Sequence, residues 1–399
     1  MNILLLSTIY PLPSENKGTS VCHYFTREWV KMGHNVRVIH NESRFPLPFY
    51  WIAKMFQQKI IAKTGAVVYT HPIKDAKYEM DSVSVMRLSL YKPIPHGSFS
   101  KRAVRNSIKA ITQWLKEDHF DPEIIVGHFP NPQIEQVAEL KRVWPSATSA
   151  IVMHDGIDLT KKVYGNRLSQ LCDNVDVWGF RSESVRKMFN RVVMTTQRSF
   201  ICYSGIPKDY ITTENTHDFF GPLKKFVYVG EMIERKYPVQ VMDALQKAYP
   251  EGDYRLTYVG QGDLLNVIHD RVEKENLQDC VNTLGKIPRD KIKEHYDNAD
   301  CMVMISRGEA YGLVYLEAMA RGCITIASRD EGFDGVIKNG ENGFLCKAGD
   351  ADELASIIIQ INSLSSEERQ RISENAITTA RSLTDTKAAQ RYLEDLINA

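Results

Sequence analysis

Continuous apolar runs alternate with helical stripes along the chain, and its two halves begin with the same pattern. In the first half, the run 3–6 is followed by a loop with Pro and Gly, by apolar positions at helical spacing, and by a second run at 36–39. A continuous apolar run is typical of a parallel strand that is buried on both faces. The second half repeats this order with runs at 226–230 and 256–260. Alternating strands and helices predict an α/β fold with two doubly wound, Rossmann-like sheets.

A polar stretch without periodicity, residues 211–217, separates the two halves. It predicts a first domain over 1–212 and a second over 217–385, and 399 residues suffice for two domains of about 150–200 residues each. The last helical segment, 386–399, is expected to pack back on the first domain. Ligands bind beyond the carboxyl ends of the strands in such sheets, so two facing domains are expected to form a cleft.

Two carboxylates eight positions apart mark the segment that says most about function. A buried-type strand at 301–305 leads into a polar loop with Glu309, crosses Tyr311 and Gly312, and opens into a helix with Glu317. Within one helix the two side chains would point about 80° apart, so they converge only if Glu309 lies on the loop. The helix N-terminus between them offers free N–H groups and a positive dipole end, which suit a phosphate. Since carboxylates accept hydrogen bonds from paired hydroxyls, the segment predicts a nucleotide-sugar site.

With the glycine-rich tail at 339–345, this segment resembles the family 4 retaining glycosyltransferases (glycosyl transferases group 1), and the likeness extends from the first strand to the last helix. The resemblance implies a GT-B fold, in which two Rossmann-like domains face each other across a cleft. It also implies that Glu309 holds hydroxyls of the donor sugar and that Glu317 holds the two ribose hydroxyls. The N–H groups of Tyr311 to Leu313 are expected to face the diphosphate.

The segment after the strand that ends at Gly230 carries two cations, Arg235 and Lys236. The family commonly places cations here, where charge develops on the leaving diphosphate. Glu231 stands where many members have an arginine, and Arg235 is expected to supply that charge. A solvated basic turn is the alternative. Since such enzymes need no metal and no acidic ligand pair is found, we expect neither a metal nor a cofactor; the co-substrate is a nucleotide-diphosphate sugar, with a UDP-sugar favoured.

Three further positions are candidates by resemblance. Gly18 follows the first strand, where a glycine lets backbone approach a substrate, although a plain turn would explain it too. His154 ends an apolar strand where family members carry a histidine that contacts the donor sugar near the reacting carbon; His128 is a weaker candidate. Lys286 lies in a loop that the family uses to hold the nucleotide base, largely through backbone, but ordinary loop chemistry also accounts for its sequence. Neither half contains GxGxxG, which argues against a dehydrogenase.

The expected mechanism follows from the same resemblance. A double-displacement enzyme needs a carboxylate beneath the anomeric carbon, and the family provides none. Its retention of configuration is attributed to attack on the same face while the leaving phosphate accepts the proton of the acceptor. His154, Glu309 and Lys236 are therefore the predicted catalytic residues, acting by positioning and by charge stabilisation.

The acceptor side is less specific. Residues 45–63 are aromatic, apolar and basic, and they predict either an amphipathic helix at a membrane interface or a helix that packs in the core. Residues 1–212 contain 28 Lys and Arg against 18 Asp and Glu. This excess favours an anionic membrane surface, although chance and attraction between the domains are alternatives. The interfacial helix would use six side chains, and a second basic helix five: Trp51, Ile52, Met55, Phe56, Lys59 and Lys63; Lys101, Arg102, Arg105, Lys109 and Lys116.

The seven cysteines are scattered without metal-ligand spacing, no apolar run is long enough to span a bilayer, and the first residues lack the pattern of a leader. We therefore expect a cytoplasmic protein that associates with the inner face of a membrane. Its expected function is transfer of a sugar to a glycan or lipid-linked acceptor in surface polysaccharide synthesis, without a nucleic-acid partner. The alternatives are a transferase for a small soluble acceptor such as a sugar phosphate, and a non-catalytic GT-B subunit.

Overall fold

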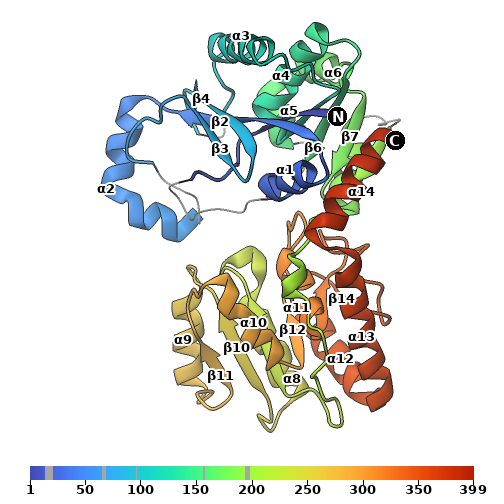
Figure 1. The fold of residues 1–399 in the computed structure, drawn as a ribbon. Coiled ribbons are helices and arrows are strands. Elements are labelled where there is room, and N and C mark those ends of the chain that lie inside the picture. Colours follow the sequence, from blue (N-terminus) through green and yellow to red (C-terminus); the bar gives the residue numbers. More distant parts are fainter. Residues whose placement is uncertain (14–20, 65–68, 96, 156–157, 194–197) are drawn as a thin grey trace. The chain divides into compact units, whose positions relative to one another are not determined.

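The computed structural model describes residues 1–13, 21–64, 69–95, 97–155, 158–193 and 198–399, without the side chains of 58–64 and 159. The chain forms two compact units (Figure 1). The first contains Met1–Arg181, Val185–Tyr203 and Asp385–Ala399, and the second contains Ser182–Ser184 and Ser204–Thr384. Each unit is built on its own sheet, in agreement with the predicted α/β class.

The first unit has an eight-stranded sheet in the order β3-β4-β2-β1-β5-β6-β7-β8. The pairing between β3 and β4 is antiparallel, and the other pairs are parallel. Chain order reverses between β1 and β5, which makes the carboxyl ends of these two strands the point where such sheets bind ligands. The strands are β1 (Asn2–Ser7), β2 (Asn35–Arg44), β3 (Ala76–Met80), β4 (Val83–Tyr91), β5 (Ile124–His128), β6 (Thr148–Met153), β7 (Val177–Phe180) and β8 (Ser199–Ile201). The helices are α1 (Val21–Lys31), α2 (Leu47–Thr64), α3 (Lys101–Glu117), α4 (Pro130–Val143), α5 (Asp158–Tyr164), α6 (Arg167–Cys172), α7 (Glu183–Asn190) and α14 (Asp385–Asn398).

The first strand shows why its apolar run is continuous. Ile3 and Leu5 enter one core cluster and Leu4 and Leu6 enter another, so alternate side chains of β1 are buried on opposite faces. The first of these clusters includes α1 and the C-terminal helix α14, where the indole of Trp29 donates a hydrogen bond to a backbone carbonyl of α14. The last helix of the chain is therefore part of the first unit.

The second unit has a six-stranded parallel sheet in the order β11-β10-β9-β12-β13-β14, which is the Rossmann order. Its switch point lies between β9 and β12. Helices α8 and α12 pack together, as do α11 and α13. The strands are β9 (Lys225–Val229), β10 (Arg255–Val259), β11 (Val281–Thr283), β12 (Cys301–Val303), β13 (Ile324–Ser328) and β14 (Phe344–Cys346). The helices are α8 (Pro238–Ala248), α9 (Leu265–Lys274), α10 (Arg289–Asp297), α11 (Leu313–Arg321), α12 (Ala351–Ser363) and α13 (Ser366–Ser382), with 3-10 turns η1 (Lys208–Tyr210) and η2 (Glu234–Lys236).

The chain crosses into the second unit earlier than the polar stretch at 211–217 suggests. Ser204 already belongs to the second unit, and Ile206 bridges to Thr384 beside it. The N–H of Thr212 then donates to the carbonyl of Ala320 in α11. Residues 204–212 are thus held by backbone hydrogen bonds to the second unit, which polarity along the sequence does not reveal.

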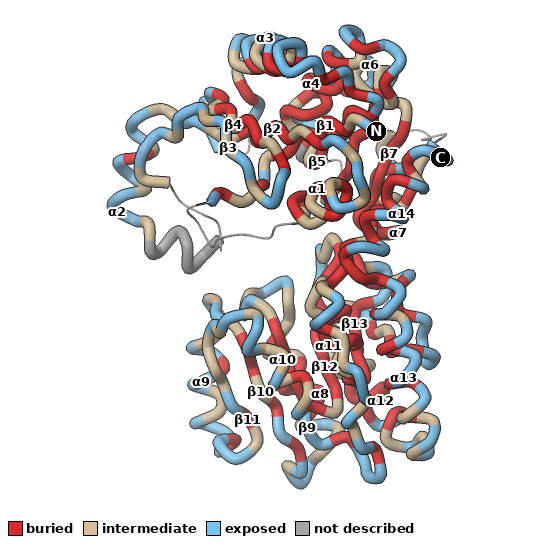
Figure 2. Tube along the Cα trace, viewed as in Figure 1, coloured by how far each residue is buried: buried red, intermediate tan, exposed pale blue. Residues whose placement is uncertain are grey.

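Helix α2 exposes its apolar residues instead of packing them in the core. Trp51 is 69% exposed and Met55 76% exposed, and Leu47, Ile52 and Phe56 are exposed as well. In Figure 2 most of the described positions of this helix are exposed or intermediate. Only Tyr50 is buried in the first turn, where its hydroxyl accepts the N–H of Phe45. The core-packing alternative is therefore wrong for these five exposed side chains, although it holds for Tyr50.

The side chains of Lys59 and Lys63 lie outside the described residues. Within the described part of the chain, no helix has the length and apolar character needed to cross a bilayer.

Candidate functional site

Two loops meet at the switch point of the second sheet. One follows β9 and contains η2, and the other follows β12 and leads into α11. Their backbones are joined, since the N–H of Arg307 donates to the carbonyl of Arg235 over 2.7 Å. The structure places Glu309 on the second loop and Glu317 within α11. Both candidate carboxylates thus arise from one strand–loop–helix unit.

Glu309 faces the cations of the first loop. Its Oε2 lies 3.4 Å from Nζ of Lys236 and 3.9 Å from Nη1 of Arg235. That oxygen is buried and receives no hydrogen bond from the described residues. The carboxylate is therefore held by charge, while Oε2 keeps its capacity to accept a hydrogen bond from a ligand hydroxyl.

The backbone around Glu309 is fixed by a neighbouring loop. Its N–H donates to Oε2 of Glu331 over 3.0 Å. Burial raises the pKa of Glu331, while the N–H groups of Glu309 and Gly308 act in the opposite direction. Gly332 lies against the same loop so closely that a Cβ there would meet the carbonyl oxygen of Glu309 at 2.4 Å. The carboxylate of Glu331 and the backbone at Gly332 thus hold the loop with Glu309 in place from the side of β13.

The two cations of the first loop differ in exposure. The side chain of Lys236 is 13% exposed and that of Arg235 is 47% exposed. Glu231, for which Arg235 was expected to compensate, is exposed. Lys236 is consequently the better placed of the two cations to act on a bound anion, and the solvated-turn alternative does not describe it.

Glu317 pairs with a residue that the sequence analysis missed. Nε and Nη2 of Arg289, the first residue of α10, both lie 2.7 Å from its Oε1. Burial raises the pKa of Glu317, and the guanidinium opposes this shift. Because Arg289 directly follows Pro288, the sequence indicates that it lies at the start of a helix. The sequence does not indicate that its partner is Glu317.

The start of α11 is shaped by a glycine. Gly312 caps the helix with a φ of +89°, and a Cβ there would lie 2.4 Å from the ring of Tyr315. The first N–H groups of a helix have no acceptor within it, and those of Leu313 and Val314 remain available to an anion, whereas the N–H of Tyr315 donates to the carbonyl of Gly312. The hydroxyl of Tyr311 donates to the carbonyl of Ser204, and its buried ring therefore has a structural role.

The structure says less about two other predicted donor-binding residues. Lys286 is exposed, and no described side chain pairs with it. Gly18 lies outside the described residues. No group of metal-ligating side chains is found among the described residues.

His154 belongs to the first unit and directly follows β6. Its Nε2 lies 2.9 Å from Nδ1 of His128, and its ring stacks on Phe129 with the centroids 3.8 Å apart. Burial, followed by the neighbouring His128 and Arg181, lowers the pKa of His154 well below its ordinary value. The weaker candidate His128 is thus the direct partner of the stronger one.

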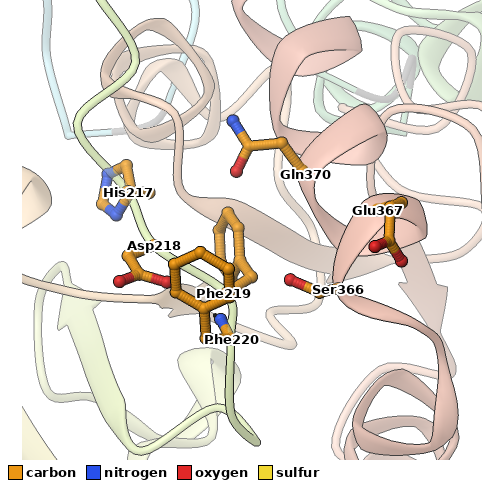
Figure 3. A pocket seen from close by; sticks show the side chains of 7 residues that line it. All are labelled: His217, Asp218, Phe219, Phe220, Ser366, Glu367 and Gln370. Carbon is orange, nitrogen blue, oxygen red and sulfur yellow. Dashed lines mark hydrogen bonds between the residues drawn. The ribbon is translucent and has the colours of Figure 1, made fainter.

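A surface pocket of about 380 Å³ lies elsewhere on the second unit (Figure 3). It is lined by the segment 217–220 and by the first turn and a half of α13. His217 contacts the carbonyl of Arg321, the last residue of α11, so the pocket lies toward the amino ends of the strands. Glu309 follows the carboxyl end of β12 instead. The pocket contains none of the predicted site residues and lies apart from the candidate chemistry.

The model of the family described as glycosyl transferases group 1 matches residues 211–379. This range includes both loops at the switch point, both carboxylates and their cationic partners. Over these residues the chain is similar to the glycosyl transferases group 1 family. The resemblance inferred from the loop, the helix and the glycine-rich tail is thereby confirmed.

Two curated proteins are similar to part of the chain. The chain is 34% identical over 138 residues to the N-acetyl-alpha-D-glucosaminyl L-malate synthase of Bacillus anthracis, covering 35% of this chain and 36% of that protein. It is 31% identical over 145 residues to the amylovoran biosynthesis glycosyltransferase AmsK of Erwinia amylovora, with coverages of 35% and 36%. The matches thus span about a third of the length of these relatives.

A solved structure covers the whole chain. The Anabaena protein HepE, in a crystal structure with UDP, matches with a TM-score of 0.69 and 16% identity over 100% of both chains. This likeness concerns the fold, which is that of the GT-B glycosyltransferases. The predicted fold class is therefore confirmed.

Proposed function

We propose that the protein transfers a sugar from a nucleotide-diphosphate sugar, with UDP as the nucleotide, to a glycan or lipid-linked acceptor. The observation that carries this proposal is the arrangement of Glu309 and Lys236 beside the start of α11, within a matched group 1 region. A hydroxyl-accepting carboxylate, an ammonium group and a helix N-terminus suit the sugar and the diphosphate of one ligand. Glu317, held by Arg289, would accept the ribose hydroxyls.

The proposed reaction retains the anomeric configuration. The acceptor hydroxyl attacks the anomeric carbon on the face that the diphosphate leaves, the bond from that carbon to the diphosphate oxygen breaks, and the leaving phosphate takes the acceptor proton. Lys236, Arg235 and the N–H groups of α11 stabilise the charge that develops on the diphosphate. Glu309 and His154 act on the sugar by positioning it. We further propose that these groups suffice without a metal ion.

A panel of nucleotide sugars tests the donor. We expect a UDP-sugar to raise the melting temperature most, because a ligand that binds only the folded state stabilises it. Donor turnover should be lost in Glu309→Gln, should persist with a chelator, and should give a product of retained configuration by NMR. An inverted product contradicts the mechanism, and donor binding without turnover favours a non-catalytic subunit.

The acceptor is proposed to lie at an anionic membrane surface on the inner face of the cytoplasmic membrane. Helix α2 carries a stripe in which Leu47, Trp51 and Met55 follow one another at four-residue spacing, all exposed. Interfacial helices place such aromatic and aliphatic side chains at the level of the headgroups. The five basic residues of α3 are exposed in the same unit and would interact with anionic lipids.

Vesicle co-sedimentation tests this surface. We expect binding to vesicles with anionic lipid, weaker binding to neutral ones, and a loss of binding in Trp51→Ser/Met55→Ser. Met188→Ser, which removes an exposed methionine from α7, is the matched control and should bind normally. Equal binding to neutral vesicles, or none to anionic ones, contradicts the proposal.

A small soluble acceptor is the second candidate. It is favoured by the similarity to a synthase whose name specifies L-malate as a partner of the sugar. Transfer to small hydroxylated or phosphorylated acceptors in solution, in a protein that binds no vesicles, would support this candidate over the first.

A further inference from the structure

A chain of three polar side chains connects the C-terminal helix to His154 within the first unit. The hydroxyl of Tyr392 in α14 lies 2.9 Å from Nε2 of His128. Nδ1 of His128 lies 2.9 Å from Nε2 of His154. The three residues come from α14, β5 and β6, and Tyr392 is 264 positions from His128 in sequence. None of these three residues lies within 211–379, the range that the family model matches.

The direction of these hydrogen bonds follows from counting protons. Both imidazoles are neutral, because burial, with a smaller contribution from Arg181, lowers the pKa of His128 to about 3 and lowers that of His154 as well. A neutral imidazole carries one N–H and one acceptor nitrogen. Fixing the proton on one ring therefore fixes it on the other, since a single proton occupies the contact between them.

Tyr392 determines the direction of both hydrogen bonds. It is 2% exposed, burial raises the pKa of its hydroxyl, and that hydroxyl has His128 as its hydrogen-bonding partner. An unpaired buried O–H donor costs more than an unfilled acceptor lone pair, so the hydroxyl donates to Nε2 of His128. His128 must then carry its proton on Nδ1 and donate to Nε2 of His154. His154 in turn must carry its own proton on Nδ1.

Aromatic packing holds the hydroxyl of Tyr392 in this orientation. The ring of Tyr392 makes an edge contact with Phe25 at 5.0 Å between centroids and another with Trp29 at 5.1 Å. His154 stacks on Phe129 on its other side. Nδ1 of His154 has no hydrogen bond to a described residue and is not among the buried unpaired atoms. The N–H on Nδ1 is therefore the polar group of His154 that is not used in its contact with His128.

We propose that Tyr392 and His128 are positioning residues that hold His154 as its Nδ1–H tautomer, so that His154 offers the donor sugar a hydrogen-bond donor and not a base. The part of this inference that concerns the sugar rests on the proposed function. The part that concerns the tautomer stands on the first unit alone. It gives α14 a role in the site in addition to its packing, because the hydroxyl that orients His154 comes from this helix.

Nitrogen-15 NMR of histidine-labelled protein tests the tautomer without any substrate. The signals of His154 are identified by their loss in His154→Gln. In the unsubstituted protein we expect a protonated Nδ1 and an unprotonated Nε2 for His154, and the same for His128. In Tyr392→Phe the orienting O–H is gone, and we expect the ratio of tautomers to shift by about three- to tenfold, as the loss of one hydrogen bond permits.

Thr386→Val is the control for packing. It removes the hydrogen bond from α14 to Glu28 but leaves Tyr392 and its contacts with Phe25, Trp29 and His128 in place, so it should alter the melting temperature without altering the tautomer. Tyr392→Phe should keep the aromatic packing, and it should lower kcat by about three- to tenfold with little change in KM for the donor. A protonated Nε2 on His154 in the unsubstituted protein overturns the proposal, as does an unchanged tautomer in Tyr392→Phe. If no donor turns over at all, the proposed function fails, while the spectrum still decides the tautomer.

Discussion

Nζ of Lys236 lies 3.4 Å from Oε2 of Glu309, and that buried oxygen accepts no hydrogen bond from the described residues. The contact is an ion pair without a well-formed hydrogen bond. Such a pair holds the carboxylate in place by charge while leaving both groups able to bond to a ligand. Arg235 approaches the same oxygen only to 3.9 Å from a more exposed position, which ranks the two cations.

Lys236→Gln should therefore impair the protein more than Arg235→Gln. We expect the lysine variant to lower kcat for donor turnover by about 10²–10³, the range found when one preorganised stabiliser of a developing charge is removed. The arginine variant should lose about tenfold or less, because solvent screens an exposed guanidinium. Kinetics on both variants with one donor checks the ranking, and equal losses would show that exposure does not distinguish them.

The pair of Arg289 and Glu317 predicts a destabilisation that depends on pH. Arg289→Met leaves a carboxylate that is 4% exposed without its cation, and we expect a loss of about 1–3 kcal/mol at pH 7. This expected loss is smaller than for a fully buried ion pair because the arginine side chain is 37% exposed. Urea denaturation measures this loss, and Glu317→Gln combined with Arg289→Met should recover part of it.

The sign of the pH dependence follows from the raised pKa of Glu317. The folded state binds this proton more tightly than the unfolded state, where a glutamate titrates near about 4.3. The stabilising contribution is thus complete below that value and is lost as the pH rises through the folded-state pKa. Removing the guanidinium raises the pKa further, so Arg289→Met should lose stability more steeply between pH 4 and 7 than the unsubstituted protein. A parallel pH profile for the two proteins would contradict this account.

The sequence predicted the loop–helix placement of the carboxylates because the necessary signals are local. A buried strand, a glycine at the turn and apolar helical positions all lie within 301–321, and the fold follows from such short-range patterns. The same holds for β1, whose unbroken apolar run reflects burial on both faces of the sheet. In these places local preference and tertiary structure agree.

The contacts that were missed depend on distant parts of the chain. Arg289 reaches Glu317 from another helix, and Tyr392 reaches His128 across 264 positions, so neither pairing has a local signature. Helix α2 is a different case, because an apolar stripe has the same periodicity whether it faces a core or a membrane. The exposure of Trp51 and Met55 in the folded unit argues against the core, and contact with a membrane stays a prediction.

Glu28 should make the docking of α14 sensitive to acid. Its carboxylate accepts hydrogen bonds from Lys31 over 2.7 Å, from Arg27 over 3.0 Å and from Thr386 of α14 over 2.8 Å. Burial alone would raise the pKa of Glu28, but these donors bring it below its ordinary value. The stabilisation is therefore present above the unfolded-state pKa of about 4.3 and is lost as the pH falls through the folded-state pKa.

Glu28→Gln should consequently destabilise the protein by about 1 kcal/mol at pH 7 and by less at pH 3.5, as followed by urea denaturation. Glu79→Gln, at an exposed glutamate of the same unit, is the control and should change stability by less than about 0.5 kcal/mol. If the difference between Glu28→Gln and the unsubstituted protein stays constant from pH 7 to pH 3.5, ionisation of Glu28 does not stabilise α14.

Gly332→Ala should disturb the site through the backbone. The added Cβ would meet the carbonyl oxygen of Glu309 at 2.4 Å and the backbone nitrogen of Tyr311 at 2.5 Å, and neither atom can rotate away as a side chain could. We expect a loss of about 1–3 kcal/mol in stability, as for other overpacked positions, together with weaker donor binding. Gly221→Ala is the matched control, because a Cβ there meets nothing within 4 Å. Calorimetric titration with the donor that stabilises the protein most should separate the variants, and unchanged affinity in Gly332→Ala would mean that the position of this loop does not govern donor binding.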